Sequence, residues 1–280
     1  MKNLFLLVAS ILCFSATAQE KNYLRVASYN LRYNNPGDGE NAWPNRKDAV
    51  KSLIVFHDFD IFGTQEGLVG QLKDICELPD YNYIGVGRDD GVDSGEHSAI
   101  IYKKNRFELL LSGNFWLSTT PETPSKGWDA ICCNRICSWG KFRDTGSNRE
   151  FYFFNVHFDH EGKTARIESG KLMVQKIKEI AGNYPVICTG DFNSTPETLQ
   201  IQAMQVLLND SYMVSAIPPY GPEGTFNNFN PNSDFEDGRI DYIFTGKCFN
   251  VSKYAALTDR YENKYPSDHL PVIADINWIE

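Results

Sequence analysis

The chain has 280 residues, with 36 acidic against 27 basic side chains and a formal net charge of −9. An acidic chain is a poor general binder of nucleic acid, because binding to the phosphate backbone depends on Lys, Arg and counterion release. The charge still permits a local basic site. The length suits one large α/β domain and provides enough residues for a substantial hydrophobic core.

Residues 1–18 have the features of a secretory signal peptide. Lys2 precedes an apolar run from Leu4 to Phe14, and the small residues Ala16 and Ala18 form an A-x-A cleavage site. The run is too short to span a bilayer, and no later stretch has enough unbroken apolar residues to do so. We therefore expect export to the periplasm or the extracellular space, and one soluble, monomeric domain over residues 19–280.

Strand-like runs recur along the whole chain. In chain order they are residues 23–31, 59–66, 81–87, 98–104, 107–117, 134–142, 150–158, 184–192, 238–246 and 269–278. Apolar residues recur at helical intervals in residues 45–55, 67–78, 163–180 and 196–208. The helices fall mostly in the first and later parts of the chain, around a strand-rich middle. This mixture predicts two sheets packed face to face, with helices on their outer faces.

The stretch VICTGDFNSTPE places polar side chains at the end of an apolar run. Residues 186–188 predict a buried strand, and Ser194 with Glu197 predicts the start of a helix. Asp191 and Asn193 therefore lie in a tight turn at a strand exit, where they are suited to hold a water or a metal-bound phosphate. An Asx-turn that merely joins strand to helix is the alternative.

Similar polar residues lie next to several other apolar strands. They are Asn30, Glu66, His157, Asp241, Asp268 and His269. The set is rich in Asp, Glu, Asn and His and lacks Cys, which indicates a hard cation bound near a phosphate. The carboxylates would bind Mg²⁺, and the histidines would transfer protons near neutral pH.

Six motifs occur in the order found in the endonuclease/exonuclease/phosphatase superfamily, the deoxyribonuclease I-like fold. They are SYNLRY, TQEG, NVHFDH, TGDFNS, GRIDYIF and SDHLPV, and the match extends over residues 23–278. The chain therefore resembles a secreted bacterial-type member of this superfamily. The resemblance implies an α/β (α+β) fold, a four-layer α-β-β-α sandwich of two packed mixed sheets.

The resemblance also implies roles for the residues at the strand ends. Glu66 resembles the principal Mg²⁺ ligand, with Asn30 beside it and Asp268 as a further metal contact. Asp191 and Asn193 resemble the pair that orients the attacking water and the phosphate.

Two histidines resemble catalytic imidazoles, and the sequence leaves open which is the acid and which the base. Asp241 would accept a proton from His269 and fix its tautomer. Glu96 falls where the secreted deoxyribonucleases have a glutamate paired with the histidine that His157 resembles. The alternative for Glu96 is an exposed loop side chain.

Three further side chains are candidate substrate contacts. Arg32 stands where the apurinic-site endonuclease branch has an Asp ligand; this departure removes one acidic ligand and leaves open whether one or two ions bind. Arg135 resembles a phosphate-contacting arginine of the secreted nucleases, with a simple surface arginine as the alternative. Trp128, in the Pro-rich loop of residues 117–130, would either stack against a substrate or pin the loop to the core.

The closely spaced Cys132, Cys133 and Cys137 fit no zinc pattern. Export permits a disulfide among them without requiring one. We therefore expect a structural role, paired or unpaired.

Together these features predict a secreted Mg²⁺-dependent phosphoester hydrolase, with Mn²⁺ as a substitute, and favour a phosphodiester over a monoester. The substrates left open are DNA or RNA, a phospholipid headgroup as in sphingomyelinases, and a small phosphorylated sugar or inositol. The sequence has no Lys/Arg-rich run for a polynucleotide and no apolar hairpin for a membrane lipid, which leaves a small soluble ester. A binding module that kept the fold and lost catalysis is the alternative from another class.

Overall fold

The computed structural model describes residues 23–279, so the expected signal peptide and its cleavage site lie outside the described residues. Strands of this part of the chain form two six-stranded sheets. The first sheet contains, in spatial order, β11 (Phe249–Ala256), β12 (Val272–Trp278), β1 (Leu24–Asn30), β2 (Ile61–Gln65), β4 (Ile100–Lys103) and β3 (Tyr81–Ile84). The second contains β5 (Phe107–Trp116), β6 (Ile136–Asp144), β7 (Arg149–His157), β8 (Val186–Asp191), β10 (Asp241–Thr245) and β9 (Asn209–Asp210).

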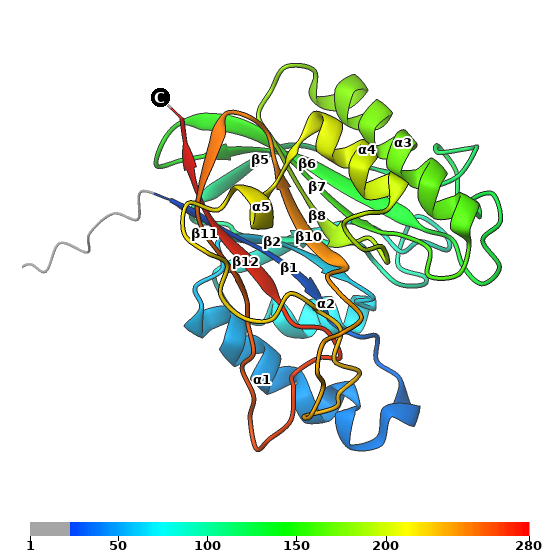
Figure 1. The fold of residues 1–280 in the computed structure, drawn as a ribbon, viewed down its shortest axis with the longest axis vertical. Coiled ribbons are helices and arrows are strands. Elements are labelled where there is room, and N and C mark those ends of the chain that lie inside the picture. The colour runs from blue at the N-terminus through cyan, green and yellow to red at the C-terminus, as the bar shows by residue number, and fades with distance from the viewer. Residues whose placement is uncertain (1–22, 280) are drawn as a thin grey trace, which may run out of the picture.

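Both sheets are mixed, and helices cover their outer faces (Figure 1). β1 pairs in parallel with β2, and β7 with β8, while the other pairs are antiparallel. Helices α1 (Trp43–Phe56) and α2 (Val69–Ile75) cover the first sheet, and α3 (Lys163–Ala181) and α4 (Leu199–Leu207) cover the second. The 3₁₀-helix η1 (Pro36–Asn41) and the one-turn helix α5 (Ser211–Val214) are short. The predicted four-layer α-β-β-α sandwich is confirmed.

Three apolar clusters fill the three interfaces between these layers. Phe142, Phe153 and Ile243 belong to the cluster between the sheets. Met173 of α3 belongs to the cluster on the outer face of the second sheet, and Val50 of α1 to that on the outer face of the first. The apolar periodicity that predicted the helices therefore corresponds to the faces that they bury. Within residues 23–279, no helix is both long and apolar enough to cross a lipid bilayer.

The observed elements differ from the predicted ones in several places: the short elements η1, β9 and α5 were not predicted, and two larger differences concern β11 and α4. Strand β11 was missed, and its pairing with β12 shifts register between Val251 and Lys253, which interrupts the alternation of apolar residues. Helix α4 begins at Leu199, with Thr198 as N-cap, so the expected cap at Ser194 was wrong. The hydroxyl of Ser194 instead accepts a hydrogen bond from the side-chain amide of Gln200 at 2.5 Å.

A buried amide links the two sheets directly beneath their functional edge. The Nδ2 group of Asn155, in β7, donates to the carbonyl oxygen of Thr64 in β2 at 2.8 Å. Its Oδ1 atom accepts hydrogen bonds from Gln65 Nε2 at 2.8 Å and from Thr189 Oγ1 at 3.0 Å. The end of β2 is therefore fixed relative to β7 and β8, which matters because all three strands end at the same cavity.

Gly63 makes room for this link, and its replacement by alanine is expected to destabilise the fold. A Cβ atom at Gly63 would lie 2.0 Å from Asn155 Oδ1 and 2.2 Å from Thr189 Oγ1. Relieving the clash would break buried hydrogen bonds, so Gly63→Ala should lower the free energy of unfolding by roughly 2 kcal/mol or more, measured by urea denaturation. Gly70→Ala, in α2 with open space around it, is the matched control. Equal stability of the two variants would contradict the packing argument.

Candidate active site

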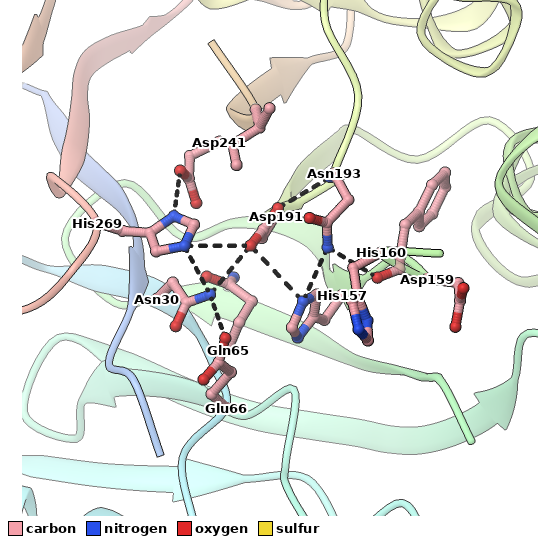
Figure 2. Close-up of polar contacts among 12 residues, drawn as sticks. Asn30, Gln65, Glu66, His157, Asp159, His160, Asp191, Asn193, Asp241 and His269 are labelled. Atoms are coloured by element: carbon pink, nitrogen blue, oxygen red, sulfur yellow. Dashed lines mark hydrogen bonds and ion pairs between the residues drawn. The ribbon is translucent and has the colours of Figure 1, made fainter. Parts of the chain in front are cut away.

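The carboxyl ends of four strands meet at one edge of the sandwich. Asn30 ends β1 opposite Gln65, which ends β2, while His157 ends β7 opposite Asp191, which ends β8. Because each pair is parallel, both of its ends point to the same edge. Glu66 follows β2 directly, with a positive φ of 62°. The polar residues predicted from strand ends are therefore brought together, as Figure 2 shows.

Asp191 lies at the centre of this cluster, between two imidazole rings (Figure 2). Its Oδ1 atom accepts the backbone N–H of Asn193 at 2.9 Å, and its Oδ2 atom accepts Asn30 Nδ2 at 3.0 Å. The Nε2 atoms of His157 and His269 lie 3.6 Å and 3.8 Å from the same Oδ2. Burial raises the pKa of Asp191 to about 7, and the neighbouring Asp241 carboxylate adds to the rise.

The two histidines have opposite electrostatic environments. His269 Nδ1 lies 2.9 Å from Asp241 Oδ2; burial alone would lower the pKa of His269, but the Asp241 carboxylate raises it well above its usual value. His157 Nδ1 lies 3.1 Å from Arg135 Nη1, and burial together with the Arg135 charge lowers its pKa well below the usual value. A guanidinium only donates, so Nδ1 of His157 accepts and the hydrogen of this neutral ring lies on Nε2. His269 is thus the charged imidazole and His157 the neutral one.

Asp241→Asn is expected to bring the pKa of His269 down towards the value of a free imidazole. The amide keeps the shape of the carboxylate but removes the negative charge that stabilises the imidazolium. The measurement is an NMR titration of the His269 ring. Asp38→Asn is the control, because Asp38 lines the same cavity but bonds Arg32. An unchanged His269 pKa in Asp241→Asn would show that the Asp241 carboxylate does not stabilise the protonated His269 ring.

Two acidic side chains lining the cavity fit a divalent cation. Glu66 Oε1 accepts Asn30 Nδ2 at 3.1 Å, and Oε2 accepts the backbone N–H of Tyr33 at 3.2 Å. Burial raises the pKa of Asp268 to about 6, and the charge of Glu66 adds to the rise. Carboxylate oxygens are the ligands that a hard cation such as Mg²⁺ prefers.

Asn30 is oriented as a hydrogen-bond donor towards two carboxylates, and its expected role as a metal ligand stays a prediction. Its Oδ1 atom accepts the backbone N–H of Arg32 at 2.9 Å, so Nδ2 faces Glu66 and Asp191. Its amide therefore positions the two carboxylates. Atoms of Asp191, Asp241 and His269 also lie within 4.8 Å of one another, a second arrangement able to hold an ion, although the Asp241–His269 hydrogen bond favours a proton pathway.

Two predicted arginines line the cavity, and both are held by other side chains. Arg32 donates to Asp38 at 2.9 Å and 3.0 Å, and its Nε lies 3.8 Å from Asp268 Oδ2. Arg135 is only 5% exposed and contacts His157 and, at 2.7 Å, His160 Nδ1. Arg135 is therefore part of the buried wall rather than a surface arginine.

The expected pairing of Glu96 with His157 was wrong. Glu96 Oε2 accepts a hydrogen bond from Arg88 Nη1 at 2.5 Å, and Arg135 occupies the position beside His157 Nδ1. Glu96 nevertheless lines the cavity, and burial raises its pKa. Arg88 pairs with Glu96 because their backbones lie side by side: the backbone N–H of Arg88 donates to the carbonyl oxygen of Glu96 at 3.0 Å.

Trp128 lies apart from this cavity, so its expected place in the substrate pocket was also wrong. It is 36% exposed and lines a separate groove with Pro121 of its own loop and Leu172 of α3. In the same loop Cys132 and Cys133 form a disulfide, while Cys137 is a free, buried thiol.

The cavity has a volume of about 540 Å³, in the usual range for a small-molecule site. Several of its residues were not predicted, because they come from loops rather than strand ends. These are Tyr33, Asp38, Arg88, Cys133, His160, Phe226, Asn228, Phe229 and Ile240. The ring of Phe226 lies 5.1 Å from that of His269, edge to face. Of these residues, Tyr33, His160 and Ile240 lie within the quoted motifs SYNLRY, NVHFDH and GRIDYIF, although they were not predicted as site residues.

Two packed mixed sheets with a carboxylate–histidine cavity at their strand ends define the phosphoesterase-type, deoxyribonuclease I-like class of fold. The chain belongs to the Endonuclease/Exonuclease/phosphatase family, whose sequence profile matches residues 27–269. Members of this family are hydrolases that act on phosphoester bonds.

Three proteins illustrate what this chain is similar to. A solved mannosyl-6-phosphatase of Bacteroides thetaiotaomicron VPI-5482 is 48% identical, with a TM-score of 0.87, over 91% of this chain and 100% of that one. A solved endonuclease/exonuclease/phosphatase from Bacteroides vulgatus is 39% identical, with a TM-score of 0.87, over 92% and 100%. Protein L388 of Acanthamoeba polyphaga mimivirus is 29% identical over 248 residues, 82% of this chain and 91% of the viral protein.

Proposed function

We propose that this chain is an exported Mg²⁺-dependent phosphomonoesterase that removes phosphate from a phosphorylated sugar. The supporting observation is that a cavity with two carboxylates suited to a cation, one protonated histidine and one neutral histidine occurs in a chain 48% identical to a mannosyl-6-phosphatase. The monoester takes the place of the diester that the sequence alone favoured. Glucose, mannose or another sugar would fit this proposal.

The side chains divide the chemistry among them. Mg²⁺ held by Glu66 and Asp268 would polarise a phosphoryl oxygen and offset its negative charge. Asp191, with a pKa of about 7, is suited to orient the attacking water and take its proton at Oδ2 near neutral pH. His269, kept protonated by Asp241, donates a hydrogen bond or proton from Nε2. 

The neutral imidazole completes the set of hydrogen-bond donors. His157 presents Nε2–H to the side of Asp191 opposite His269. The Nδ2 group of Asn193, 3.1 Å from this nitrogen, donates its hydrogen bond to the carbonyl oxygen of Phe158 at 3.1 Å. Fixed donors aimed at developing charge stabilise the transition state without reorganisation. We therefore assign to His157 the stabilisation of developing negative charge, and to His269 the role of general acid.

The size and charge of the site favour a small ester over a polymer. A monoester dianion carries more charge than a diester, and Arg32 and His269 contribute positive charge to the cavity. A cavity of about 540 Å³ has room for one phosphorylated sugar. The net charge of −9 gives no general attraction to a polynucleotide.

A substrate panel with and without EDTA tests this function. We expect phosphate release from mannose 6-phosphate or glucose 6-phosphate that EDTA abolishes and added Mg²⁺ restores, with Mn²⁺ as a substitute. Bis(p-nitrophenyl) phosphate, DNA and sphingomyelin should be hydrolysed poorly. If one of these diesters were hydrolysed faster than the sugar phosphates, the result would contradict the proposal and favour a diesterase, a nuclease or a lipid hydrolase, respectively. No turnover of any ester would favour a binding module.

Export is the part of the proposal that rests on residues 1–18. N-terminal sequencing of the protein from the periplasmic or culture fraction should give a first residue of Gln19. An unprocessed N-terminus on protein retained in the cytoplasm would contradict it.

A further inference from the structure

The disulfide between Cys132 and Cys133 lies at the mouth of the cavity. It joins adjacent residues, with Cα atoms 3.8 Å apart, in the loop between β5 and β6. Cys133 is half-buried and lines the cavity, and Cys132 is exposed. None of the catalytic roles above uses this disulfide. A link between neighbours closes almost no loop, so it contributes little to the stability of the fold by restricting the unfolded chain.

The loop that carries the disulfide is held on both sides. The carboxylate of Asp129 accepts the backbone N–H groups of Thr164 and Ala165, in the first turn of α3, at 2.9 Å and 2.6 Å. On the other side, Asn134 Nδ2 donates to the carbonyl oxygen of Arg88 at 3.2 Å. The disulfide is therefore presented at a fixed place relative to the cavity rather than on a freely moving loop.

The neighbourhood of the disulfide is connected to the catalytic residues. A sulfur of Cys132, a ring nitrogen of His160 and a carboxylate oxygen of Glu161 lie within 4.8 Å of one another. His160 contacts Arg135, which in turn contacts His157. Metals bind cysteine as the thiolate, so the oxidised Cys132 leaves this group without a thiolate ligand.

We propose that the Cys132–Cys133 disulfide is a wall of the cavity against which the sugar ring of the substrate packs. This inference rests on the proposed sugar phosphatase function and adds the side chains that recognise the sugar. Sulfur and methylene groups are polarisable and weakly polar, so they suit the C–H face of a sugar ring. The ring formed by the disulfide has lost its side-chain rotations before binding, which lowers the entropic cost of contact. The exposed His160 and Glu161 lie beside it to meet hydroxyl groups.

The test compares the wild type with a Cys132→Ser/Cys133→Ser double variant on mannose 6-phosphate, with inorganic phosphate as inhibitor. We expect KM for the sugar phosphate to rise by about five- to twentyfold, while kcat and the Ki of inorganic phosphate stay the same. Treatment of the wild type with a phosphine reductant should raise KM likewise and leave the double variant unaffected. Cys248→Ser, which removes a free cysteine that does not line the cavity, is the matched control.

The outcomes separate this inference from the function on which it rests. If the wild type hydrolyses no sugar phosphate, the proposed function fails. If the wild type is active and the double variant has the same KM, the proposed contact between the disulfide and the sugar is wrong, while the proposed phosphatase function is supported. A fall in kcat, a weaker Ki for phosphate and a lower melting temperature together would make the disulfide a structural element, which also overturns the inference.

Discussion

Replacing Asp191 with asparagine is expected to lower kcat by at least about a hundredfold while the protein stays folded. The amide oxygen can still accept the backbone N–H of Asn193, so the turn after β8 keeps its main hydrogen bond. The variant loses the negative charge between His157 and His269 and the group that takes a proton from water. The measurements are kcat at saturating substrate and Mg²⁺, and the melting temperature.

A control variant and a second active-site variant test whether the loss of kcat in Asp191→Asn is specific to the active site. Asp48→Asn makes the same chemical change on an exposed residue of α1 and should leave kcat unchanged. His269→Ala should also lower kcat by at least about a hundredfold. The double variant should lower kcat by less than the product of the two single-variant factors, because the effects of groups that act as a unit are not additive. Near-normal activity in a folded Asp191→Asn variant would remove Asp191 from the mechanism.

The residues at strand ends could be predicted from the sequence because local pattern determines where they lie. An apolar strand followed by a polar turn places Glu66, His157 and Asp191 at a sheet edge, and parallel pairing brings those edges together. The order of the six motifs then gave the fold. What the local pattern determines is the backbone position of such a residue, not the direction or partner of its side chain.

The errors in the predicted site follow from that limit. Glu96 was placed beside His157, but it pairs with Arg88, whose loop has no distinctive pattern, and Arg135 lies beside the His157 ring instead. The local pattern also did not indicate that a backbone N–H two residues later donates to the Asn30 oxygen, and the metal contact expected of Asn30 stays a prediction. Trp128 shares a loop with the cavity-lining Cys133 and yet lies in a different groove.

Glu66 is the side chain on which metal binding is most clearly expected to depend. It lies directly after β2 and is oriented by two donors, Asn30 Nδ2 at 3.1 Å and the Tyr33 backbone N–H at 3.2 Å. A glutamine would preserve its length and shape but replace an anionic oxygen with a neutral one. Mg²⁺ strongly prefers anionic oxygen, and Asp268 would be the one carboxylate left of the proposed pair.

Glu66→Gln should therefore raise the Mg²⁺ concentration for half-maximal activity by about tenfold or more. Titration of activity with Mg²⁺, from EDTA-treated protein, measures this directly. Glu96→Gln makes the same substitution in the same cavity, but Glu96 bonds Arg88, so its half-saturation point should match the wild type. If Glu66→Gln also keeps the wild-type value, Glu66 is not a ligand. If both variants shift equally, the cation responds to the total charge of the cavity rather than to Glu66.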